Sequence, residues 1–185
     1  MGLDISYYSK IKESKEIEDD FYPSIYTSSN GYFIYQLGSL KKDAPYELTE
    51  ESEDGSFRAG SYSGYGEWRN KLSVMAGYGD ASDVWKDFGS NIRYCKLKKI
   101  NGEEFKMKPF YELICFSDCE GVIGPEISKK LYQDFLDFDE KAKDFQKNNT
   151  DFYPSPYQGD YFYQLYQNWK EAFRVASEYG AVFFH

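Results

Sequence analysis

An amphipathic period in the C-terminal half constrains the fold more than any other feature of the chain. Six apolar residues recur at steps of four, four, three, four and three: Ile127, Leu131, Phe135, Phe138, Ala142 and Phe145. This spacing places them on one face of an α-helix, and that face must be buried against another element. Pro125 and Glu126 suit a first helical turn. The pattern therefore predicts a helix over 125–146.

Three further helices are predicted. One runs over 160–179, ends before Gly180 and directs inward Phe162, Leu165, Tyr166, Trp169, Phe173 and Ala176. Another begins near Gly64, is stopped by Gly77 and Gly79, and buries Tyr65, Trp68, Leu72 and Met75. A short helix over 81–88 takes Asp80 as its N-cap and directs inward Val84, Trp85 and Phe88.

The remaining segments read as strands. Strands are predicted over 2–8, 32–37, 46–48, 57–59, 110–116 and 181–184, and a hairpin joins 92–100 to 103–107 through Asn101-Gly102. The 185 residues carry no repeat and no linker. The sequence therefore predicts a single α+β domain over 1–185. In it, the two long C-terminal amphipathic helices pack on an antiparallel or mixed sheet.

Charge and composition exclude several functions. The formal net charge of −9 disfavours nucleic-acid binding, which needs a basic face. No apolar run is long enough to span a membrane, and the N-terminus lacks the pattern of a secretory signal. A cytoplasmic protein without a membrane partner is expected. Nineteen tyrosines suit ligand pockets and interfaces. The sequence leaves open whether the chain forms a homo-oligomer.

The sequence offers few residues for metal binding or nucleophilic catalysis. The chain has three cysteines, Cys95, Cys115 and Cys119, and a single histidine, His185. This set lacks the spacing of a zinc site or a disulfide framework. A single histidine also excludes two-histidine motifs, and it excludes an ordinary serine triad unless His185 serves in it. No catalytic residue, metal or cofactor is predicted.

The candidate ligand site is the stretch over 57–69, FRAGSYSGYGEWR. Glycines let the backbone approach a ligand, arginines hold anionic groups, and a helix N-terminus favours anions. The predicted ligand-binding residues are Arg58, Ser61, Tyr62, Ser63, Tyr65 and Arg69. The alternative is that the glycines serve a tight turn alone. In that reading the arginines pair with carboxylates such as Glu67, Asp118 or Glu120.

A second candidate site lies in Ser117-Asp118-Cys119-Glu120-Gly121. Asp118 and Glu120 could share a metal or act as acid and base with His185, and Cys119 with His185 could form a nucleophile pair. Both readings require the C-terminus to dock at this loop. The alternative is that Asp118 caps a turn and Glu120 is solvated.

Three stretches together carry a resemblance: the MGLDI start, residues 57–69 and FSDCEGVIGP over 116–125. They resemble a family of small uncharacterised proteins of bacteriophages and prophages. The resemblance implies a phage protein made in the bacterial cytoplasm, and by analogy a counter-defence protein that sequesters a small anionic, nucleotide-like ligand without catalysis. The alternatives are an acidic inhibitor or decoy of a host protein, and an enzyme acting on a nucleotide.

Overall fold

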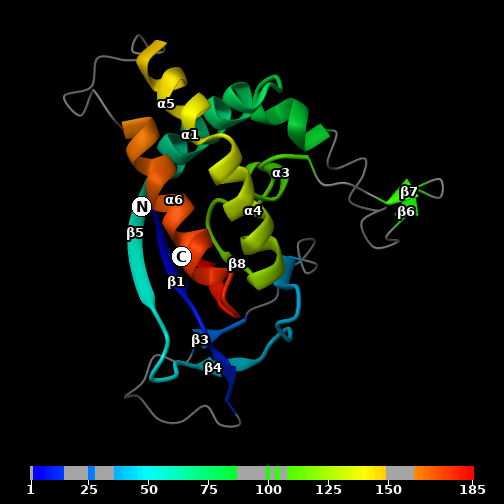
Figure 1. The fold of residues 1–185 in the computed structure, drawn as a ribbon, viewed down its shortest axis with the longest axis vertical. Helices are drawn as coiled ribbons and strands as arrows, with labels where there is room; N and C mark the ends of the chain where they lie inside the picture. Colours follow the sequence, from blue (N-terminus) through cyan, green and yellow to red (C-terminus); the bar gives the residue numbers. More distant parts are fainter. Residues whose placement is uncertain are drawn as a thin grey trace.

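A four-stranded antiparallel sheet organises the protein, in the order β5-β1-β9-β8. Its strands are β1 (Gly2–Tyr8), β5 (Asp54–Ser61), β8 (Gly121–Ile123) and β9 (Ala181–Phe184). The computed structural model describes residues 2–14, 25–27, 36–86, 99–100, 103–104, 108–148 and 161–185. The C-terminal strand β9 lies inside the sheet, between the N-terminal strand and β8 (Figure 1). The strands predicted over 2–8, 57–59 and 181–184 are confirmed.

Alternation along β1 explains how the sheet separates two faces. Leu3 and Ile5 are fully buried and belong to the main core, whereas Asp4 between them is exposed. Buried and exposed residues also alternate on β5, where Ala59 is buried and Arg58 is exposed. One face of the sheet thus meets the helices, and the other carries polar residues at this end.

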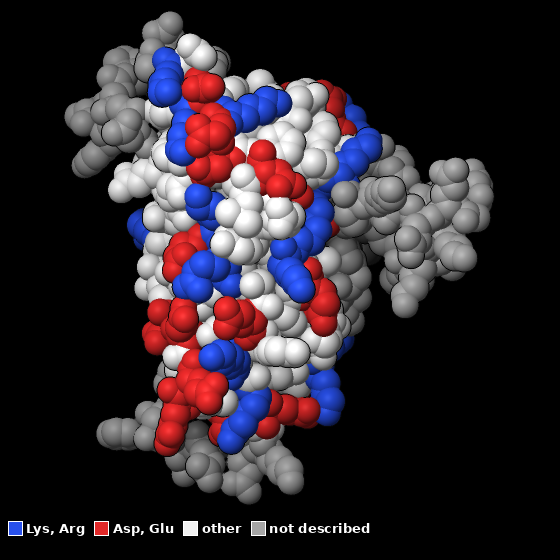
Figure 2. Space-filling view, in the orientation of Figure 1, with Lys and Arg blue, Asp and Glu red and all other residues white. Residues whose placement is uncertain are grey.

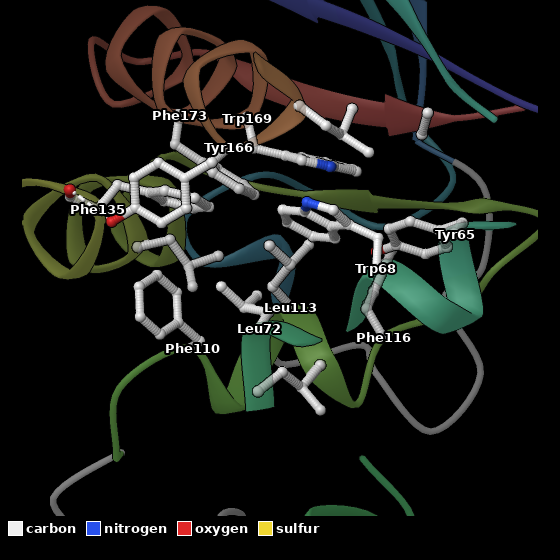
Figure 3. Close-up of a cluster of buried hydrophobic side chains, with 14 of the residues drawn as sticks. Tyr65, Trp68, Leu72, Phe110, Leu113, Phe116, Phe135, Tyr166, Trp169 and Phe173 are labelled. Atoms are coloured by element: carbon white, nitrogen blue, oxygen red, sulfur yellow. Dashed lines mark hydrogen bonds between the residues drawn. The ribbon is translucent and has the colours of Figure 1, made fainter. Parts of the chain in front are cut away.

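Helices α1 (Tyr62–Ala76), α4 (Pro125–Asp137) and α6 (Tyr161–Ala176) cover the apolar face of the sheet, and α5 (Asp139–Asn148) packs against these helices (Figure 1). α6 packs on β1, β5 and β9, and α4 packs beside α6. Figure 3 shows Trp68 of α1 facing Trp169 of α6 at the centre of this core, with stacked rings 6.0 Å apart. Phe135 and Trp169 have no exposed surface, as the predicted packing of both C-terminal helices requires.

A smaller layer covers part of the opposite face. It contains a sheet in the order β2-β4-β3, built from Lys12–Glu13, Pro45–Glu47 and Ile25–Tyr26. Its apolar residues pack against Val122, Ala181 and Phe183 of the main sheet. β4 lies where a short strand near Tyr46 is predicted. Gln36 and Leu37 form a 3₁₀ turn in place of a strand end, and residues 32–35 lie outside the described residues.

The predicted hairpin is present where it is described. β6 (Lys99–Ile100) pairs antiparallel with β7 (Glu103–Glu104). The rest of the predicted hairpin, the turn at 101–102 and Cys95 included, lies outside the described residues. Within the described part of the chain, no helix is both long and apolar enough to cross a membrane.

The helix predicted over 125–146 is divided at Phe138 into α4 and α5. The apolar stripe is retained, because Leu131, Phe135 and Ala142 are all fully buried. The break lets Asp139 begin α5 and accept hydrogen bonds from the side chains of Tyr163, Gln167 and Lys170. Burial alone would raise the pKa of Asp139, but the hydrogen bonds from Lys170, Gln167 and Lys143 outweigh burial and lower it. Partners on another helix thus fix the break, which explains why local periodicity misses it.

The strand predicted over 110–116 is wrong. This segment forms the short helix α3 (Tyr111–Ile114), which begins after Phe110 in a left-handed conformation with φ of 60°. Asp134 accepts the Phe110 N–H at 2.8 Å and holds that turn. A short apolar run does not distinguish a buried strand from a buried helix, and here contacts from other elements decide.

Two smaller predictions need correction. Asp80 does cap the helical residues 81–86, accepting the N–H of Ser82 at 2.7 Å, and Val84 is buried. Trp85, however, is 47% exposed rather than inward. Its indole N–H donates to the carbonyl of Ile114. Phe88 lies outside the described residues.

Candidate functional site

The stretch over 57–69 is a direct strand-to-helix junction, without the loop that its glycines predict. β5 ends at Ser61 and α1 begins at Tyr62. The Ser61 hydroxyl accepts the N–H of Gly64 at 3.0 Å and caps the helix. Gly60 has φ of +115°, and a Cβ there would lie 2.8 Å from the Tyr161 hydroxyl. Glycine at 60 therefore serves this backbone turn and close approach.

The predicted binding residues at the start of the junction are on the surface. Ser61 and Ser63 are exposed, with their hydroxyls 3.1 Å apart, and Tyr62 is half-buried. Arg58 lies on the sheet face opposite the helices. Its Nη1 donates to both carboxylate oxygens of Asp4, at 3.1 and 3.3 Å. Most of both side chains is exposed, so the pair contributes little to stability.

Arg69 lies in a different place, inside the core against α3. Its side chain is 7% exposed. Nη1 donates to the carbonyls of Phe116 at 2.9 Å and Ile114 at 3.4 Å, which end α3. The guanidinium also lies 4.7 Å from the ring centre of Tyr65, one turn earlier on α1, and 5.5 Å from that of Trp85. Arg69 thus neutralises helix-end carbonyls and stacks on aromatic rings.

Two buried polar groups at this place lack hydrogen-bond partners among the described residues. They are the Nε of Arg69 and the hydroxyl of Tyr65, and both are buried. Burial raises the pKa of Tyr65 strongly, against the opposing charge of Arg69. The hydroxyl therefore stays protonated and able to donate. Buried polar groups are ordinarily hydrogen-bonded to protein or water. Two buried donors without such partners, on residues one helical turn apart, therefore make this a candidate binding site.

A carboxylate partly compensates Arg69. Asp118 Oδ2 lies 3.6 Å from Nη2, and the Asp118 side chain is 49% exposed. The sequence offered Asp118 as one possible carboxylate partner of an arginine, and the structure places it there. The Ser117 hydroxyl shapes this loop by accepting the N–H groups of Cys119 and Glu120, at 3.3 and 3.1 Å. Cys119 and Glu120 are exposed.

The C-terminus docks beside this loop, as the second candidate site requires. His185 exchanges two backbone hydrogen bonds with Asp4, at 3.0 and 3.3 Å. Gly121, which ends this loop, pairs with Phe184, the residue before His185. Among the residues that the structure describes, however, no three His, Cys, Asp or Glu side chains are arranged to hold a metal ion. Asp118, Glu120 and His185 therefore do not form a metal centre here.

A cluster that the sequence reasoning missed lies on the other side of α3. Glu112 is fully buried, and its carboxylate accepts from Lys130 at 2.6 Å; Lys130 also bridges to Asp134 at 2.8 Å. The third Lys130 bond goes to the carbonyl of Lys108 at 2.7 Å. Burial raises the pKa of both carboxyl groups, and Lys130 offsets this in part. The one available signal was a glutamate inside an otherwise apolar run.

Comparison with family models, with curated proteins and with solved structures finds no match for this chain. The function is therefore argued from the site alone. Of the six predicted ligand-binding residues, Tyr65 and Arg69 lie together at the buried site with Asp118 and Trp85. Arg58 and Ser61 are exposed on β5, and Tyr62 and Ser63 are the first residues of α1.

Proposed function

We propose that this protein binds a small anionic ligand, such as a nucleotide signal, without transforming it, and holds the anionic group at Arg69. One observation carries the proposal. Among the described residues, neither the Nε of the buried Arg69 nor the hydroxyl of Tyr65 has a hydrogen-bond partner, although the guanidinium lies 4.7 Å from the centre of the Tyr65 ring. Only a half-exposed carboxylate, at 3.6 Å, faces its Nη2. Burying a charge is costly unless it is fully paired.

An anion would complete this pairing. A phosphate or carboxylate accepts bidentate bonds from a guanidinium and a further bond from a hydroxyl. Bonds of this charged kind are worth about 1.5–3 kcal/mol each. Asp118 then acts as an internal competitor for the guanidinium. Because its side chain is already half exposed, a ligand can displace it into solvent at modest cost.

The exposed ring of Trp85 favours a ligand with an aromatic base, such as a nucleotide. Its ring is 47% exposed and is held by the bond from its indole N–H to Ile114, with the guanidinium of Arg69 nearby. A fixed, exposed indole offers a stacking surface at little entropic cost. No second function receives comparable support. Figure 2 shows acidic and basic side chains interspersed over the face formed by α4–α6, rather than the one-signed patch that suits an acidic decoy.

The resemblance over 57–69 and 116–125 connects this binding with phage biology. It supports a protein of the bacterial cytoplasm that counters host defence by sequestering an immune nucleotide. Release of the ligand unchanged is the expected behaviour. Turnover of a bound nucleotide would favour the enzyme reading, and a co-purifying host protein without any ligand would favour the inhibitor.

The test removes the competitor instead of the arginine, since Arg69 also caps α3 and its loss threatens the fold. Asp118→Asn should tighten binding of an anion by about three- to tenfold, and Glu120→Gln, an exposed neighbour, should leave it unchanged. Cyclic mononucleotides, cyclic dinucleotides, ADP-ribose and inorganic phosphate are screened by thermal shift, and the affinities of the ligands found are measured by calorimetry. If none of these anions binds, or if both variants bind alike, the proposal is wrong.

The variant Arg58→Ala tests which of the two predicted arginines, Arg58 or Arg69, binds the anion. Arg58 pairs with Asp4 on the opposite sheet face, so this change should leave the affinity for the anion unaltered. A ten- to a hundredfold loss, the size expected for a charged hydrogen bond to the ligand, would instead move the site to Arg58, Ser61 and Ser63.

A further inference from the structure

Among the described residues, the outer edge of strand β5 pairs with no other strand. The strand is eight residues long and ends the order β5-β1-β9-β8, so among the described strands only β1 pairs with it. Figure 1 shows β5 in cyan at the left margin of the sheet, with no labelled element beyond it. An unpaired edge offers a row of backbone donors and acceptors to another strand.

The hydrogen bonds of Asp4 identify which residues of β5 are open. Asp4 gives its N–H to the carbonyl of His185 and accepts the N–H of His185 in return. Its backbone groups therefore face β9, and in an antiparallel ladder its partner on the other side is not hydrogen-bonded to it. That partner is Arg58. The backbone groups of Arg58 thus point away from β1, and by alternation so do those of Ser56 and Asp54.

The side chains of these residues are self-complementary. Asp54, Ser56 and Arg58 are all exposed and lie on the same face of the strand, at every second position. Their sequence along the strand is acidic, neutral, basic. When such a strand pairs antiparallel with a copy of itself about Ser56, each Asp54 lies opposite an Arg58. Charged side chains on an edge strand ordinarily oppose association, but in this register each charge meets one of opposite sign.

We propose that two copies of this chain associate through β5, antiparallel and about a two-fold axis at Ser56. The two four-stranded sheets then form one continuous sheet, and Asp54 of each copy pairs with Arg58 of the other. The bonds of Arg58 to Asp4 come from Nη1 alone, and a guanidinium has five N–H groups, so it can hold both carboxylates. A register centred on Phe57 would place Arg58 opposite Ser56 and leave both charges without opposite partners.

The extent of the ladder sets the strength of the contact. The pairing of β1 with β5 shifts register between Leu3 and Asp4, and this irregularity next to Ala59 and Gly60 confines a regular ladder to residues 54–58. A contact of this size is at the weak end of specific interfaces. The expected dimer is therefore concentration-dependent and in exchange with monomer. This association is independent of ligand binding at Arg69.

Charge reversal tests the register. In sedimentation velocity over a concentration series, the wild-type chain should form a dimer, and Asp54→Arg or Arg58→Asp should each weaken it about tenfold through like-charge contacts. The double variant Asp54→Arg/Arg58→Asp restores opposite charges and should restore the dimer. Asp83→Arg, an exposed change of the same charge on another element, should have no effect. Failure of the double variant to recover association overturns the proposal.

Ser56→Pro provides a test that does not depend on the new charges. The N–H of Ser56 points to the free edge, so proline there removes no hydrogen bond within the chain and is tolerated in an edge strand. The variant should keep a cooperative thermal transition and sediment as a monomer at all concentrations. A wild-type chain that is monomeric at every concentration would contradict the proposal, as would a dimer that Ser56→Pro leaves intact.

Discussion

Glu112 places a carboxylate entirely inside the protein. Its Oε2 is bonded to Lys130, but its Oε1 has no hydrogen-bond partner among the described residues. An ionised carboxylate in such surroundings loses more hydration than one lysine returns. Burial accordingly raises the pKa of Glu112 above its ordinary value, with Lys130 only partly opposing the effect. The folded state thus holds this proton more tightly than the unfolded chain does.

This difference predicts a pH-dependent stability. Because the pKa of Glu112 is higher in the folded state, its contribution to stability is complete below the unfolded value of about 4.5 and is lost as the pH rises through the folded value. Denaturant titrations between pH 7 and pH 4.5 should therefore show the wild type gaining stability relative to Glu112→Gln as the pH falls. Asp134, whose pKa is also raised, shares Lys130 with Glu112, so both proteins are compared in an Asp134→Asn background to isolate the titration of Glu112. Parallel pH profiles would contradict the assignment to Glu112.

At the scale of elements, the sequence predicts well where local pattern and final packing agree. The stripes of α4–α5 and α6 fix both helix and buried face, since one side of each helix must enter the core. The secondary-structure prediction fails at α3, because side chains from other segments, Arg69 and Trp85, donate hydrogen bonds to the carbonyl of Ile114. The candidate site divides in the same way. Residue types indicated Asp118 as one of three possible carboxylate partners for the arginines, whereas the pairing of Arg58 with Asp4 depends on strand register.

The junction of β5 and α1 gives a prediction at this scale. Ser61 caps α1 through Gly64, and Ser63, two residues later, contacts only the Ser61 hydroxyl in the bonds described. Ser61→Ala should lower the free energy of unfolding by about 1 kcal/mol, the usual cost of a lost N-cap. Ser63→Ala, an equal truncation on the same exposed turn, should cost clearly less. Urea titrations of both variants measure the difference, and equal losses would show that the cap contributes nothing.

The whole molecule is held together by its last strand. β9 separates the two apolar layers: Val182 and Phe184 face the helices, and Ala181 and Phe183 face the smaller sheet. It also joins the N-terminal strand β1 to β8, segments that have no pairing with each other. The apolar run over 181–184 predicts a strand, but its central place depends on partners far away in the sequence. Local pattern cannot supply that information.

A truncation after Gly180 should therefore abolish the native fold rather than trim one edge. It removes the ladders to both β1 and β8 and exposes the core around Trp169, whose ring lies 5.4 Å from that of Phe184. Loss of one buried phenylalanine side chain alone costs about 3–5 kcal/mol, a large share of the roughly 5–15 kcal/mol that stabilises a typical domain. Circular dichroism should show no cooperative thermal transition in the truncated chain. His185→Ala, which keeps the backbone bonds to Asp4, should melt close to the wild type. A cooperative transition of wild-type size in the truncated chain would mean that β9 is dispensable.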